Sequence, residues 1–529
     1  MKLKELLKDV CVLSKQNYND NLEVEAITDN SKKACKNSLF FALIGTNTNG
    51  SVFIYEATKN GAKVVVLQED DLLKKAVFEQ KKLKKNNKVI LGNKNSSNLS
   101  KTSNVQKTAD ICYIFVDDIR KQMSKISANF YYNAHQNLKI ISVVGTNGKT
   151  STSHILYSIL RQAKKSVGVI GTNSIIINDE KRSFDMTTPD PIFLHQLFFE
   201  MAQKNVEYVV IEVSAHAIFF HKMYGVKSIC TIFTNFSQDH LDFFDSMEKY
   251  KNTKISFFNS KNTNVSILNM DDDVSMEISR QTDTPILTFG IKKPSDVFAV
   301  NISMNLSGSE FVVNYQDEVF SIKTNLTCLF NVYNILGAIA CSKVLNIKTI
   351  DIKKALSNLD KIAGRFDIVD LKQNFNIVVD YAHTPDSLKS LLENIKSLSK
   401  SKIITVFGCP GNRDELKREI MGKIAGKYSE YCIITSDNPQ FENSIKILRQ
   451  IESGVKKTNC PYKLVDNRKN AISLAISIAP PKSTVLIVGK GTENYQNING
   501  EHIPYSDYDE IKSQILLAKK LKLNSKFLY

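Results

Sequence analysis

One short segment constrains the fold of this chain more than any other, the glycine-rich sequence GTNGKT at residues 145–150. It follows an apolar run at 138–144 that is typical of a buried strand, and the residues after it have helical spacing. A strand, a glycine turn and a helix place successive backbone N–H groups and a helix N-terminus around a phosphate. The segment therefore predicts a phosphate-binding loop within an α/β domain.

The loop is a short variant, because the eight-residue phosphate-loop pattern requires glycine where Val143 stands. Within it Lys149 is placed to reach the β- and γ-phosphates of a nucleotide, and the hydroxyl of Thr150 to bind Mg²⁺. A glycine turn without a ligand is the alternative. The strand before the loop and the helix after it favour the phosphate-binding interpretation.

Two further segments carry candidate metal ligands at the ends of apolar strands. Glu212 ends the apolar run 208–211, and a carboxylate there, beside a phosphate loop, is suited to hold Mg²⁺ directly or through water. His240 lies in TNFSQDHLDFF at 234–244, after the apolar run 228–234. Taken singly, Glu212 is more typical of a surface residue and His240 of a packed core histidine, so each depends on the loop for its interpretation.

The chain is long enough for several domains, since its 529 residues exceed what one hydrophobic core usually supports. Alternating strand and helix patterns predict α/β domains with mostly parallel sheets. The segment 69–109 is rich in lysine, asparagine and serine, and is predicted to be a disordered or loosely ordered surface insertion. Strands are expected at 38–44, 62–67, 138–144, 166–170, 208–213, 228–234, 377–380, 403–408, 431–435 and 484–489.

Composition argues against several classes of protein. No run of eighteen apolar residues occurs, which disfavours a membrane span, and the N-terminal MKLKELLKDVCVL resembles an amphipathic helix rather than a signal peptide. The net charge of +16 comes from dispersed lysines without a nucleic-acid-binding module. The nine cysteines contain no C-x-x-C pair, so buried, reduced thiols are expected. We expect a cytoplasmic protein that binds no nucleic acid and inserts into no membrane.

Ten motifs in order resemble those of the Mur ligase family, and within it the MurE-type branch that adds the third residue of the peptidoglycan stem peptide. They cover nearly the whole chain outside 69–109. The motifs are GTNGKTST at 145–152, TTPDP at 187–191, EVSAHAI at 212–218, TNFSQDHLDFF at 234–244, FNVYN at 330–334, GRFDIVD at 364–370, DYAHTPDSL at 380–388, GCPGNRDELKR at 408–418, DNPQ at 437–440 and GKGTENYQ at 489–496.

The resemblance implies an α/β fold of three domains. A small N-terminal α/β domain at 1–118 would bind the UDP-muropeptide, a central phosphate-loop ATPase domain with a parallel sheet would span 119–361, and a Rossmann-like domain at 362–529 would bind the amino acid. It also implies an enzyme that uses ATP and Mg²⁺ to convert a carboxylate into an acyl phosphate, which an amine then attacks to form an amide. A monomer is expected.

The resemblance further implies roles for individual residues. Lys254 matches the lysine that carries CO₂ as a carbamate, and it is expected to act in catalysis with Lys149 and His240. The metal positions are Thr150, Glu212, His240 and the carbamate of Lys254. The nucleotide positions are Gly145, Thr146, Asn147, Gly148, Lys149, Thr150, Ser151, Asn334, Arg365, Asp380 and His383.

The muropeptide positions implied by the resemblance are Ser31, Thr46, Thr187, Thr188, Ser214 and Lys222. The chain departs from the family pattern at Phe220, where glutamine is frequent, and at Lys222, where arginine is frequent. A lysine keeps the positive charge of arginine but loses its bidentate fork. These two contacts are therefore less well supported than the others.

The positions that match the amino-acid pocket are Arg413, Asp437, Asn438, Gln440, Gly489 and Glu493. Family members that use meso-diaminopimelate usually have arginine where Gln440 stands, and an uncharged amide forms weaker bonds to a carboxylate. Diaminopimelate is the expected substrate and L-lysine the alternative. Another Mur ligase activity, or that of a folylpolyglutamate synthetase, is a further alternative, as is a nucleotide- or nucleic-acid-binding protein without catalysis.

Overall fold

The computed structural model describes residues 1–45, 49–69, 111–172, 174–184, 186–399 and 401–526. These residues form two compact units. The first comprises residues 1–139, 188–207 and 216–227, and the second comprises residues 140–187, 208–215 and 228–529. None of the helices in the described ranges is long and apolar enough to cross a membrane. The expected insertion at 69–109 lies, apart from Glu69, outside these ranges.

The first unit is built on a five-stranded sheet with the order β1-β5-β4-β3-β2. Its central strands are parallel, and β1 pairs antiparallel to β5. Helix α6 (Pro191–Gln203) packs against α4 and the short helix η5 of the same unit. The other elements are α1 (Leu3–Leu6), β1 (Val12–Gln16), β2 (Ala26–Thr28), η1 (Ser31–Lys33), β3 (Ser38–Phe41), η2 (Gly50–Phe53), α2 (Ile54–Lys59), β4 (Ala62–Gln68), β5 (Cys112–Val116), α4 (Ile119–Phe130) and η5 (Ala134–Asn137).

The prediction of an amphipathic N-terminal helix is wrong beyond its first turn. The α-helix spans only Leu3–Leu6, and Asp9 adopts a left-handed conformation with φ of 58°. The segment then continues as β1, whose Val12 pairs with Val116 of β5. The β-branched Val12 favours an extended backbone, and the pairing of β1 with β5 partly buries it.

The second unit contains an eleven-stranded sheet with the order β16-β15-β14-β13-β12-β11-β6-β10-β7-β8-β9. The strands from β14 to β6 run parallel, as expected, and so do β10 and β7, while both edges of the sheet are antiparallel hairpins. Its strands are β6 (Lys139–Val144), β7 (Val167–Gly171), β8 (Ser174–Ile177), β9 (Glu180–Arg182), β10 (Tyr208–Val213), β11 (Cys230–Phe233), β12 (Ser266–Asn269), β13 (Ile286–Gly290), β14 (Val297–Asn305), β15 (Gly308–Tyr315) and β16 (Glu318–Thr324).

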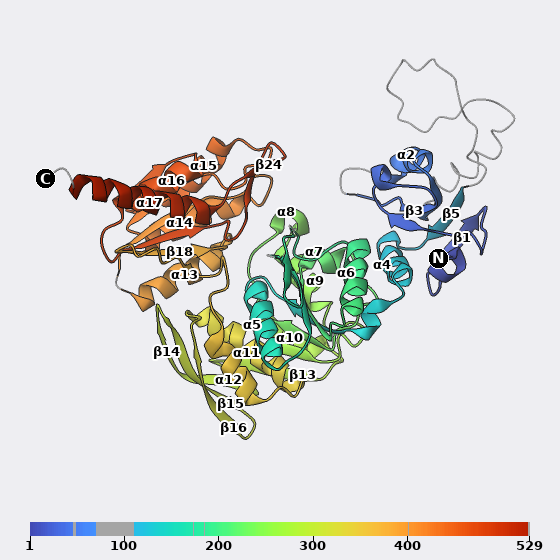
Figure 1. Ribbon diagram of the computed structural model, residues 1–529, viewed down its shortest axis with the longest axis horizontal. Helices are drawn as coiled ribbons and strands as arrows, with labels where there is room; N and C mark the ends of the chain where they lie inside the picture. Colours follow the sequence, from blue (N-terminus) through green and yellow to red (C-terminus); the bar gives the residue numbers. More distant parts are fainter. Residues whose placement is uncertain (46–48, 70–110, 173, 185, 400, 527–529) are drawn as a thin grey trace, which may run out of the picture. The chain divides into compact units, whose positions relative to one another are not determined.

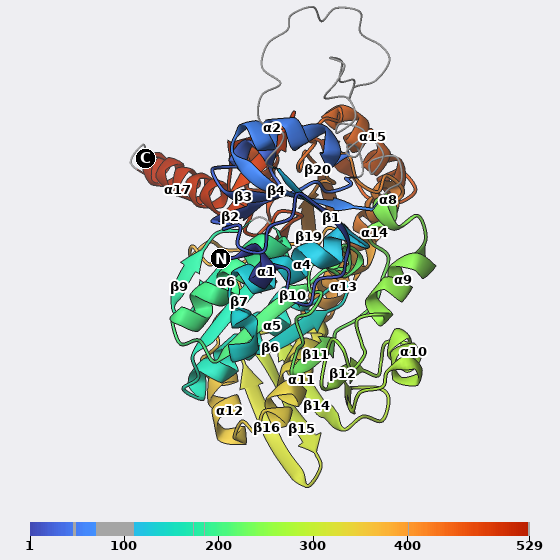
Figure 2. The same ribbon diagram turned by 90° about the vertical axis from the view of Figure 1, so that its right-hand side faces the viewer.

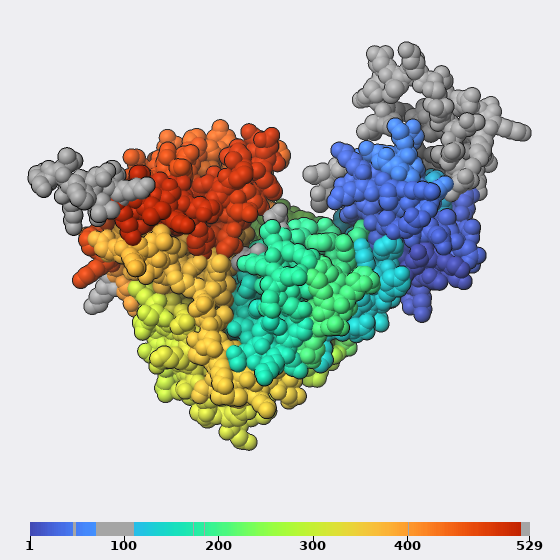
Figure 3. All heavy atoms as spheres, in the orientation of Figure 1, coloured from blue at the N-terminus to red at the C-terminus, as the bar shows by residue number. Residues whose placement is uncertain are grey.

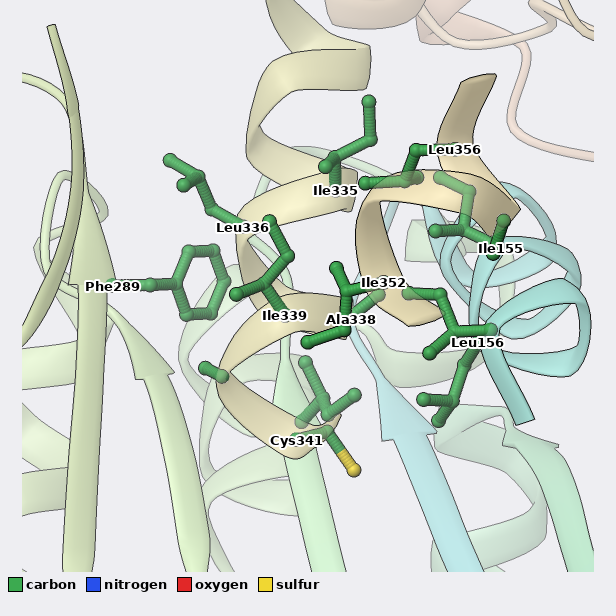
Figure 4. Close-up of a cluster of buried hydrophobic side chains, with 14 of the residues drawn as sticks. Ile155, Leu156, Phe289, Ile335, Leu336, Ala338, Ile339, Cys341, Ile352 and Leu356 are labelled. Atoms are coloured by element: carbon green, nitrogen blue, oxygen red, sulfur yellow. The ribbon is translucent and has the colours of Figure 1, made fainter. Parts of the chain in front are cut away.

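Helices cover this sheet and form its main core with it. Figure 4 shows Ile155 of α5 and Ile352 of α12 directed toward α11, whose Leu336 faces Phe289 of β13. All four side chains are buried. The helices are α5 (Lys149–Gln162), α8 (Leu241–Phe244), α9 (Met247–Ile255), α10 (Val274–Gln281), α11 (Leu329–Val344) and α12 (Thr349–Asn358). Helix α7 (Ala215–Phe219) belongs, apart from Ala215, to the first unit.

The three long antiparallel strands β14, β15 and β16 were not expected from the sequence. They lie beside α11 and α12 in both ribbon views (Figures 1 and 2). Alternate residues such as Phe311 and Val313 of β15 point into the core, whereas those between them face outward. This alternation is the usual signature of a half-buried strand.

The C-terminal part of the second unit has a six-stranded sheet with the order β17-β18-β22-β19-β20-β21. Helix α17 packs against α16, and its Ile511 and Ile515 join the core beneath this sheet. Figure 3 shows the red C-terminal segment on the visible surface of this part of the unit. The elements are β17 (Asp367–Ile368), β18 (Asn376–Asp380), α13 (Pro385–Leu398), β19 (Ile403–Phe407), α14 (Leu416–Tyr428), β20 (Tyr431–Ile434), α15 (Ser444–Val455), β21 (Tyr462–Leu464), α16 (Arg468–Ile478), β22 (Thr484–Val488), the hairpin β23 (Tyr495–Ile498) and β24 (Glu501–Pro504), and α17 (Asp507–Lys526).

All ten expected strands exist, with ends that differ by up to three residues; the expected strand at 38–44 ends at Phe41. All nine cysteines are free thiols. The expectation that they are buried is wrong for Cys11 and Cys35, which are exposed. The expected domain boundaries at 118 and 361 stay predictions.

Candidate active site

The phosphate loop connects β6 to α5, as its sequence predicts. Gly148 caps the helix with φ of 84°, and a Cβ atom there would lie 2.4 Å from Oδ1 of Asn334. The ammonium group of Lys149 donates to the carbonyl oxygens of Gly145 (2.9 Å) and Thr146 (2.8 Å), so its charge lies inside the loop. Burial lowers the pKa of Lys149, while the charges of Glu212 and Asp239 act in the opposite direction.

Residues after strand β11 fix the conformation of the loop. The backbone N–H of Asn147 donates to Oδ1 of Asn235 at 2.9 Å, and Thr234 donates to the carbonyl oxygen of Asn147 at 2.6 Å. The hydroxyl of Thr146 lies 3.2 Å from that of Tyr250 on α9. Because β6 and β11 are adjacent parallel strands, their carboxyl ends bring these segments together. Ser151, in the first turn of α5, is buried.

Glu212 at the end of β10 lies beside the loop, as expected. Its carboxylate accepts hydrogen bonds from the hydroxyls of Thr150 and Thr172, each at 3.0 Å, and is 1% exposed. The hydroxyl of Thr172 also lies 3.0 Å from that of Thr187. A buried carboxylate surrounded by hydroxyl groups provides the oxygen ligands that Mg²⁺ prefers.

Lys254 on α9 reaches the same loop. Its ammonium group donates to the carbonyl oxygen of Gly145 at 2.9 Å, and the residue is 1% exposed. Burial and the positive charge of Lys149 hold the pKa of Lys254 well below its usual value, against the opposing charges of Asp239 and Asp272. The amine is therefore predisposed to its neutral form, which is the form that reacts with CO₂.

Asp239 links His240 and His383. Its carboxylate lies 3.4 Å from Nε2 of His240 and 3.8 Å from Nε2 of His383, which holds its other ring nitrogen 2.9 Å from the carbonyl oxygen of Tyr381. Burial would raise the pKa of Asp239, but the hydrogen bond with His383 and the neighbouring charges hold it well below its usual value. His240 has φ of 56° at the start of α8, which turns the chain at this point.

Arg365 contacts the loop, and Asp380 fixes the backbone next to Arg365. Arg365 donates to the hydroxyl of Thr150 at 3.0 Å, and its guanidinium stacks 4.5 Å from the ring centre of Tyr381. Asp380 accepts from the backbone N–H groups of Phe366 (2.6 Å) and Ala382 (2.7 Å), which fixes the backbone after Arg365. Burial raises the pKa of Asp380, and the charge of Arg365 partly offsets it.

The amino-acid positions gather at the carboxyl ends of β20 and β22. Lys490 donates to Oδ1 of Asn438 (2.9 Å) and to Glu493 (2.8 Å), and Asn438 donates to the same Glu493 oxygen (2.9 Å). Gly489 has φ of 110°, and a Cβ there would lie 2.4 Å from the carboxylate of Asp437. Gln440 has φ of 54° and exchanges backbone hydrogen bonds with the β23–β24 hairpin.

Arg413 is not part of this hydrogen-bonded group. Its guanidinium lies 3.7 Å from Asp242 in the α8 segment, and 48% of its side chain is exposed. A side chain this exposed is available to an anionic ligand.

The muropeptide positions of the first unit form two local groups. Lys222 donates to the carbonyl oxygen of Thr188 at 3.2 Å and pairs with Asp190 at 2.9 Å. Ser31 donates to Glu56 at 2.5 Å. Phe220, at a position that departs from the family pattern, stacks on Arg120 at 4.3 Å. Ser214 is half-buried just after β10, and Thr46 lies outside the described residues.

The donor atoms of the loop region fit a magnesium ion only in part. Thr150 and Glu212 offer oxygen atoms, whereas Lys254 as an ammonium ion offers none. Throughout the ranges that the structure describes, no three His, Cys, Asp or Glu side chains gather into a metal site. A carbamate on Lys254 would replace a cation by two oxygen ligands and complete a set suited to a divalent ion.

Comparison with known proteins accounts for this geometry. Three family profiles match successive parts of the chain: "Mur ligase family, catalytic domain" at 23–131, "Mur ligase middle domain" at 143–342 and "Mur ligase, glutamate ligase domain" at 364–491. A relative from Caldanaerobacter subterraneus subsp. tengcongensis, named UDP-N-acetylmuramoyl-L-alanyl-D-glutamate–2,6-diaminopimelate ligase, is 36% identical over 98% of this chain and 100% of its own. The chain belongs to the Mur ligase family.

Solved structures show the same fold. One titled as a UDP-N-acetylmuramoyl-L-alanyl-D-glutamate–2,6-diaminopimelate ligase has a TM-score of 0.64 at 23% identity, covering 98% of this chain and 99% of its own. The MurF ligase from Thermotoga maritima, solved with ADP, has a TM-score of 0.58 at 17% identity, covering 95% and 100%. The expected family, the three-domain α/β fold and the class of ATP-dependent amide-bond-forming ligases are thereby confirmed.

The structure adds residues to this Mur ligase site that the sequence did not single out. Asp239 bridges two histidines, Thr172 bonds to Glu212, and Lys490 joins Asn438 to Glu493. Asp239 and Lys490 lie inside the quoted motifs, so the motifs contained a signal for them. Thr172 follows strand β7, and its only signal was a hydroxyl at the carboxyl end of a parallel strand.

Proposed function

We propose that the chain catalyses the ATP-dependent addition of meso-2,6-diaminopimelate to UDP-N-acetylmuramoyl-L-alanyl-D-glutamate in the synthesis of peptidoglycan precursors. The observation that carries the proposal is the convergence of Lys149 and Lys254 on the carbonyl oxygen of Gly145, beside the buried carboxylate of Glu212. Relatives that align with almost the entire chain are named for this reaction.

The residues of the loop bind the nucleotide. Backbone N–H groups at 145–150 and the N-terminus of α5 attract its phosphates, and Lys149 neutralises charge on the group transferred. Asn334 and Arg365 lie against the same loop, and they are assigned with Asp380 and His383 to the remainder of the nucleotide. Phosphoryl transfer to the acceptor carboxylate gives an acyl phosphate, and attack by the amine forms the amide with release of phosphate.

Thr150, Glu212, His240 and a carbamate on Lys254 would hold magnesium, which supplies charge neutralisation at the phosphoryl group. The low pKa of Lys254 supports this, because a neutral amine attacks CO₂ and then loses a proton to become an anionic carbamate. The burial of Lys254 limits the access of water to that carbamate. Asp239 acts by positioning His240 and His383 rather than by contacting the reacting atoms.

The acceptor is assigned to Thr187, Thr188, Ser214 and Lys222, with Ser31 and Thr46 at its uridine end. Lys222 is already held by Thr188 and Asp190, which orients its ammonium group. Arg120, stacked on Phe220, is a second cation in the same unit. Its guanidinium can form the bidentate hydrogen bonds to an anion that Lys222 cannot form.

The diamino acid is assigned to Arg413, Asp437, Asn438, Gln440, Gly489 and Glu493. The carboxylate of Glu493 and the amide of Asn438 are suited to an amino group, and Arg413 to a carboxylate. Diaminopimelate is favoured because the relatives are named for it, and L-lysine is the second candidate because Gln440 lacks a charge. Since the reaction consumes ATP, we place the protein in the cytoplasm. We further propose that it acts as a monomer and requires no nucleic acid.

The test is ADP formation by the purified protein with ATP, Mg²⁺, bicarbonate, the UDP-linked dipeptide and diaminopimelate or L-lysine in parallel. We expect ADP release only when acceptor and amino acid are both present, and faster with diaminopimelate. D-alanyl-D-alanine with a tripeptide acceptor, and a folate with glutamate, serve as the competing substrate pairs. Turnover with one of those pairs and none with the proposed pair would overturn the assignment.

A further inference from the structure

Two cysteines of the C-terminal sheet bring their sulfur atoms together at its edge. Sγ of Cys460 lies 3.7 Å from Sγ of Cys432. Cys432 is buried on β20, whereas Cys460 is partly exposed in the turn that leads to β21. The backbone N–H of Cys432 donates to the carbonyl oxygen of Pro461 at 3.0 Å, which holds the turn against the strand.

A pocket of about 510 Å³ opens onto Cys460. Lys423 and Lys427 of α14 and Lys457 after α15 contribute to its lining. Such a basic, partly exposed environment favours the thiolate, which is the nucleophilic form of cysteine. The hydrogen bond between the Cys460 and Cys432 thiols lowers the pKa of Cys460, and the charge of Lys396 acts in the same direction, against burial and the charge of Glu430.

We propose that Cys460 and Cys432 form an oxidisable thiol pair, in which Cys460 reacts with a small hydroperoxide and Cys432 resolves the product to a disulfide. The sulfurs need to approach by roughly 1.7 Å, since a disulfide bond is about 2.05 Å long. Cys460 lies in a turn, and a turn yields more readily than a central strand.

The chemistry balances with one hydroperoxide. The Cys460 thiolate attacks the outer peroxide oxygen, so an S–O bond forms, the O–O bond breaks, and the departing oxygen takes a proton. The Cys432 sulfur then attacks the Cys460 sulfur, the S–O bond breaks, and hydroxide leaves as water with the proton of Cys432. Two thiols lose two electrons, and the peroxide gains them.

The pair lies away from the proposed reaction centre. Ser429 and Glu430, which line the pocket, precede β20, whereas Asp437 and Asn438 follow it. The pocket is therefore at the amino end of the strand, and the assigned substrate residues are at its carboxyl end. Replacing Cys460 is accordingly expected to leave ligase turnover of the reduced enzyme unchanged.

The chain supplies its own controls. Cys230 and Cys341 are also hydrogen-bonded to each other, but both are fully buried in the core of the central sheet. Cys11 and Cys35 are exposed thiols. If sulfur proximity alone determined reactivity, Cys230 and Cys341 would oxidise as well, and if exposure alone did, Cys11 and Cys35 would react first.

The experiment treats the folded full-length protein with increasing hydrogen peroxide, blocks remaining thiols with iodoacetamide and maps peptides by mass spectrometry. We expect a Cys432–Cys460 disulfide at peroxide doses that leave Cys35 and the Cys230–Cys341 pair reduced. Cys432→Ser is expected to leave a sulfenic acid on Cys460 that dimedone traps, and Cys460→Ser to leave Cys432 reduced. Unchanged thermal denaturation midpoints verify that both variants fold.

Oxidation of Cys35 without any Cys432–Cys460 disulfide would overturn the proposal. So would oxidation of Cys432 at the wild-type dose in the Cys460→Ser variant, because Cys460 would then not be the reacting thiol. Failure of the proposed ligase activity would leave this result unaffected, since the peptide map requires no turnover.

Discussion

The ammonium group of Lys254 lies 2.9 Å from the carbonyl oxygen of Gly145, the same atom to which Lys149 donates at 2.9 Å. Two cations on one carbonyl oxygen repel each other, and this repulsion adds to the burial of Lys254 in holding its pKa low. Conversion of Lys254 to a carbamate would turn the repulsion into attraction. The pairing of the two lysines therefore supports a chemical change at Lys254 rather than a purely structural role.

Lys254→Ala is expected to reduce kcat by at least about a hundredfold, because it removes the carbamate and with it a proposed metal ligand. Formate or acetate is expected to restore part of the activity by placing a free carboxylate in the space. The matched control is Lys251→Ala on the same helix, which breaks only the ion pairs to Glu248 and Glu277. Wild-type kcat in Lys254→Ala, measured by ADP release, would refute the carbamate role.

Gln440→Arg is expected to increase the preference for diaminopimelate over L-lysine, measured as the ratio of the two kcat/KM values. A charge-assisted bond to the distal carboxylate would be worth roughly 1.5–3 kcal/mol, or about tenfold or more in that ratio. Gln440→Glu, with the opposite charge, is expected to shift the ratio toward L-lysine. If neither substitution moves the ratio, Gln440 does not face the substrate side chain.

Arg418→Lys is expected to raise the KM for the amino acid several-fold with a smaller effect on kcat. Arg418 is fully buried and forms two bonds to Glu442 (2.7 and 2.8 Å) and one to the carbonyl oxygen of Pro410, so it holds the loop that carries Arg413. Lysine keeps the charge but cannot form the fork. Arg449→Lys, at an exposed ion pair, is the control. Equal effects of both substitutions on KM would contradict this positioning role.

Stability is expected to fall as the pH drops below about 6.5. Burial lowers the pKa of His135 to about 4 and holds that of His195 well below its usual value. The unfolded chain then binds protons that the folded chain does not, so the free energy of unfolding decreases between pH 6.5 and about 4, by up to about 1.4 kcal/mol per pH unit for each histidine.

Denaturant unfolding at pH 7.5 and pH 5.5 measures this slope. His195→Leu is expected to reduce the slope and leave the contribution of His135, because it removes a ring whose Nε2 is buried without a hydrogen-bond partner in the described structure. His502→Gln, at an exposed histidine, is expected to leave the slope unchanged. A wild-type slope in His195→Leu would show that other groups cause the acid sensitivity.

The sequence predicted best those residues whose role follows from their immediate neighbours in the sequence. The strand, glycine turn and helix around Gly148 are contiguous, and Glu212 and Lys254 were recognised from motifs. The contact between Asp239 and His383 joins segments far apart in the chain, and hydrophobic periodicity along the sequence cannot predict such a contact. The hairpins β14 to β16 were missed because their polar residues face outward and mask the buried alternation. The N-terminal strand was missed because Leu3, Leu6 and Val10, which precede it, have helical spacing.

The central claim is that the acceptor carboxylate receives the γ-phosphate of ATP before the amine attacks. It is tested most directly with an acceptor labelled with ¹⁸O in that carboxylate, by measuring the isotope in the phosphate released. An acyl phosphate passes one labelled oxygen to phosphate for each amide formed, so we predict one ¹⁸O per phosphate. Amide formation with unlabelled phosphate would contradict the account.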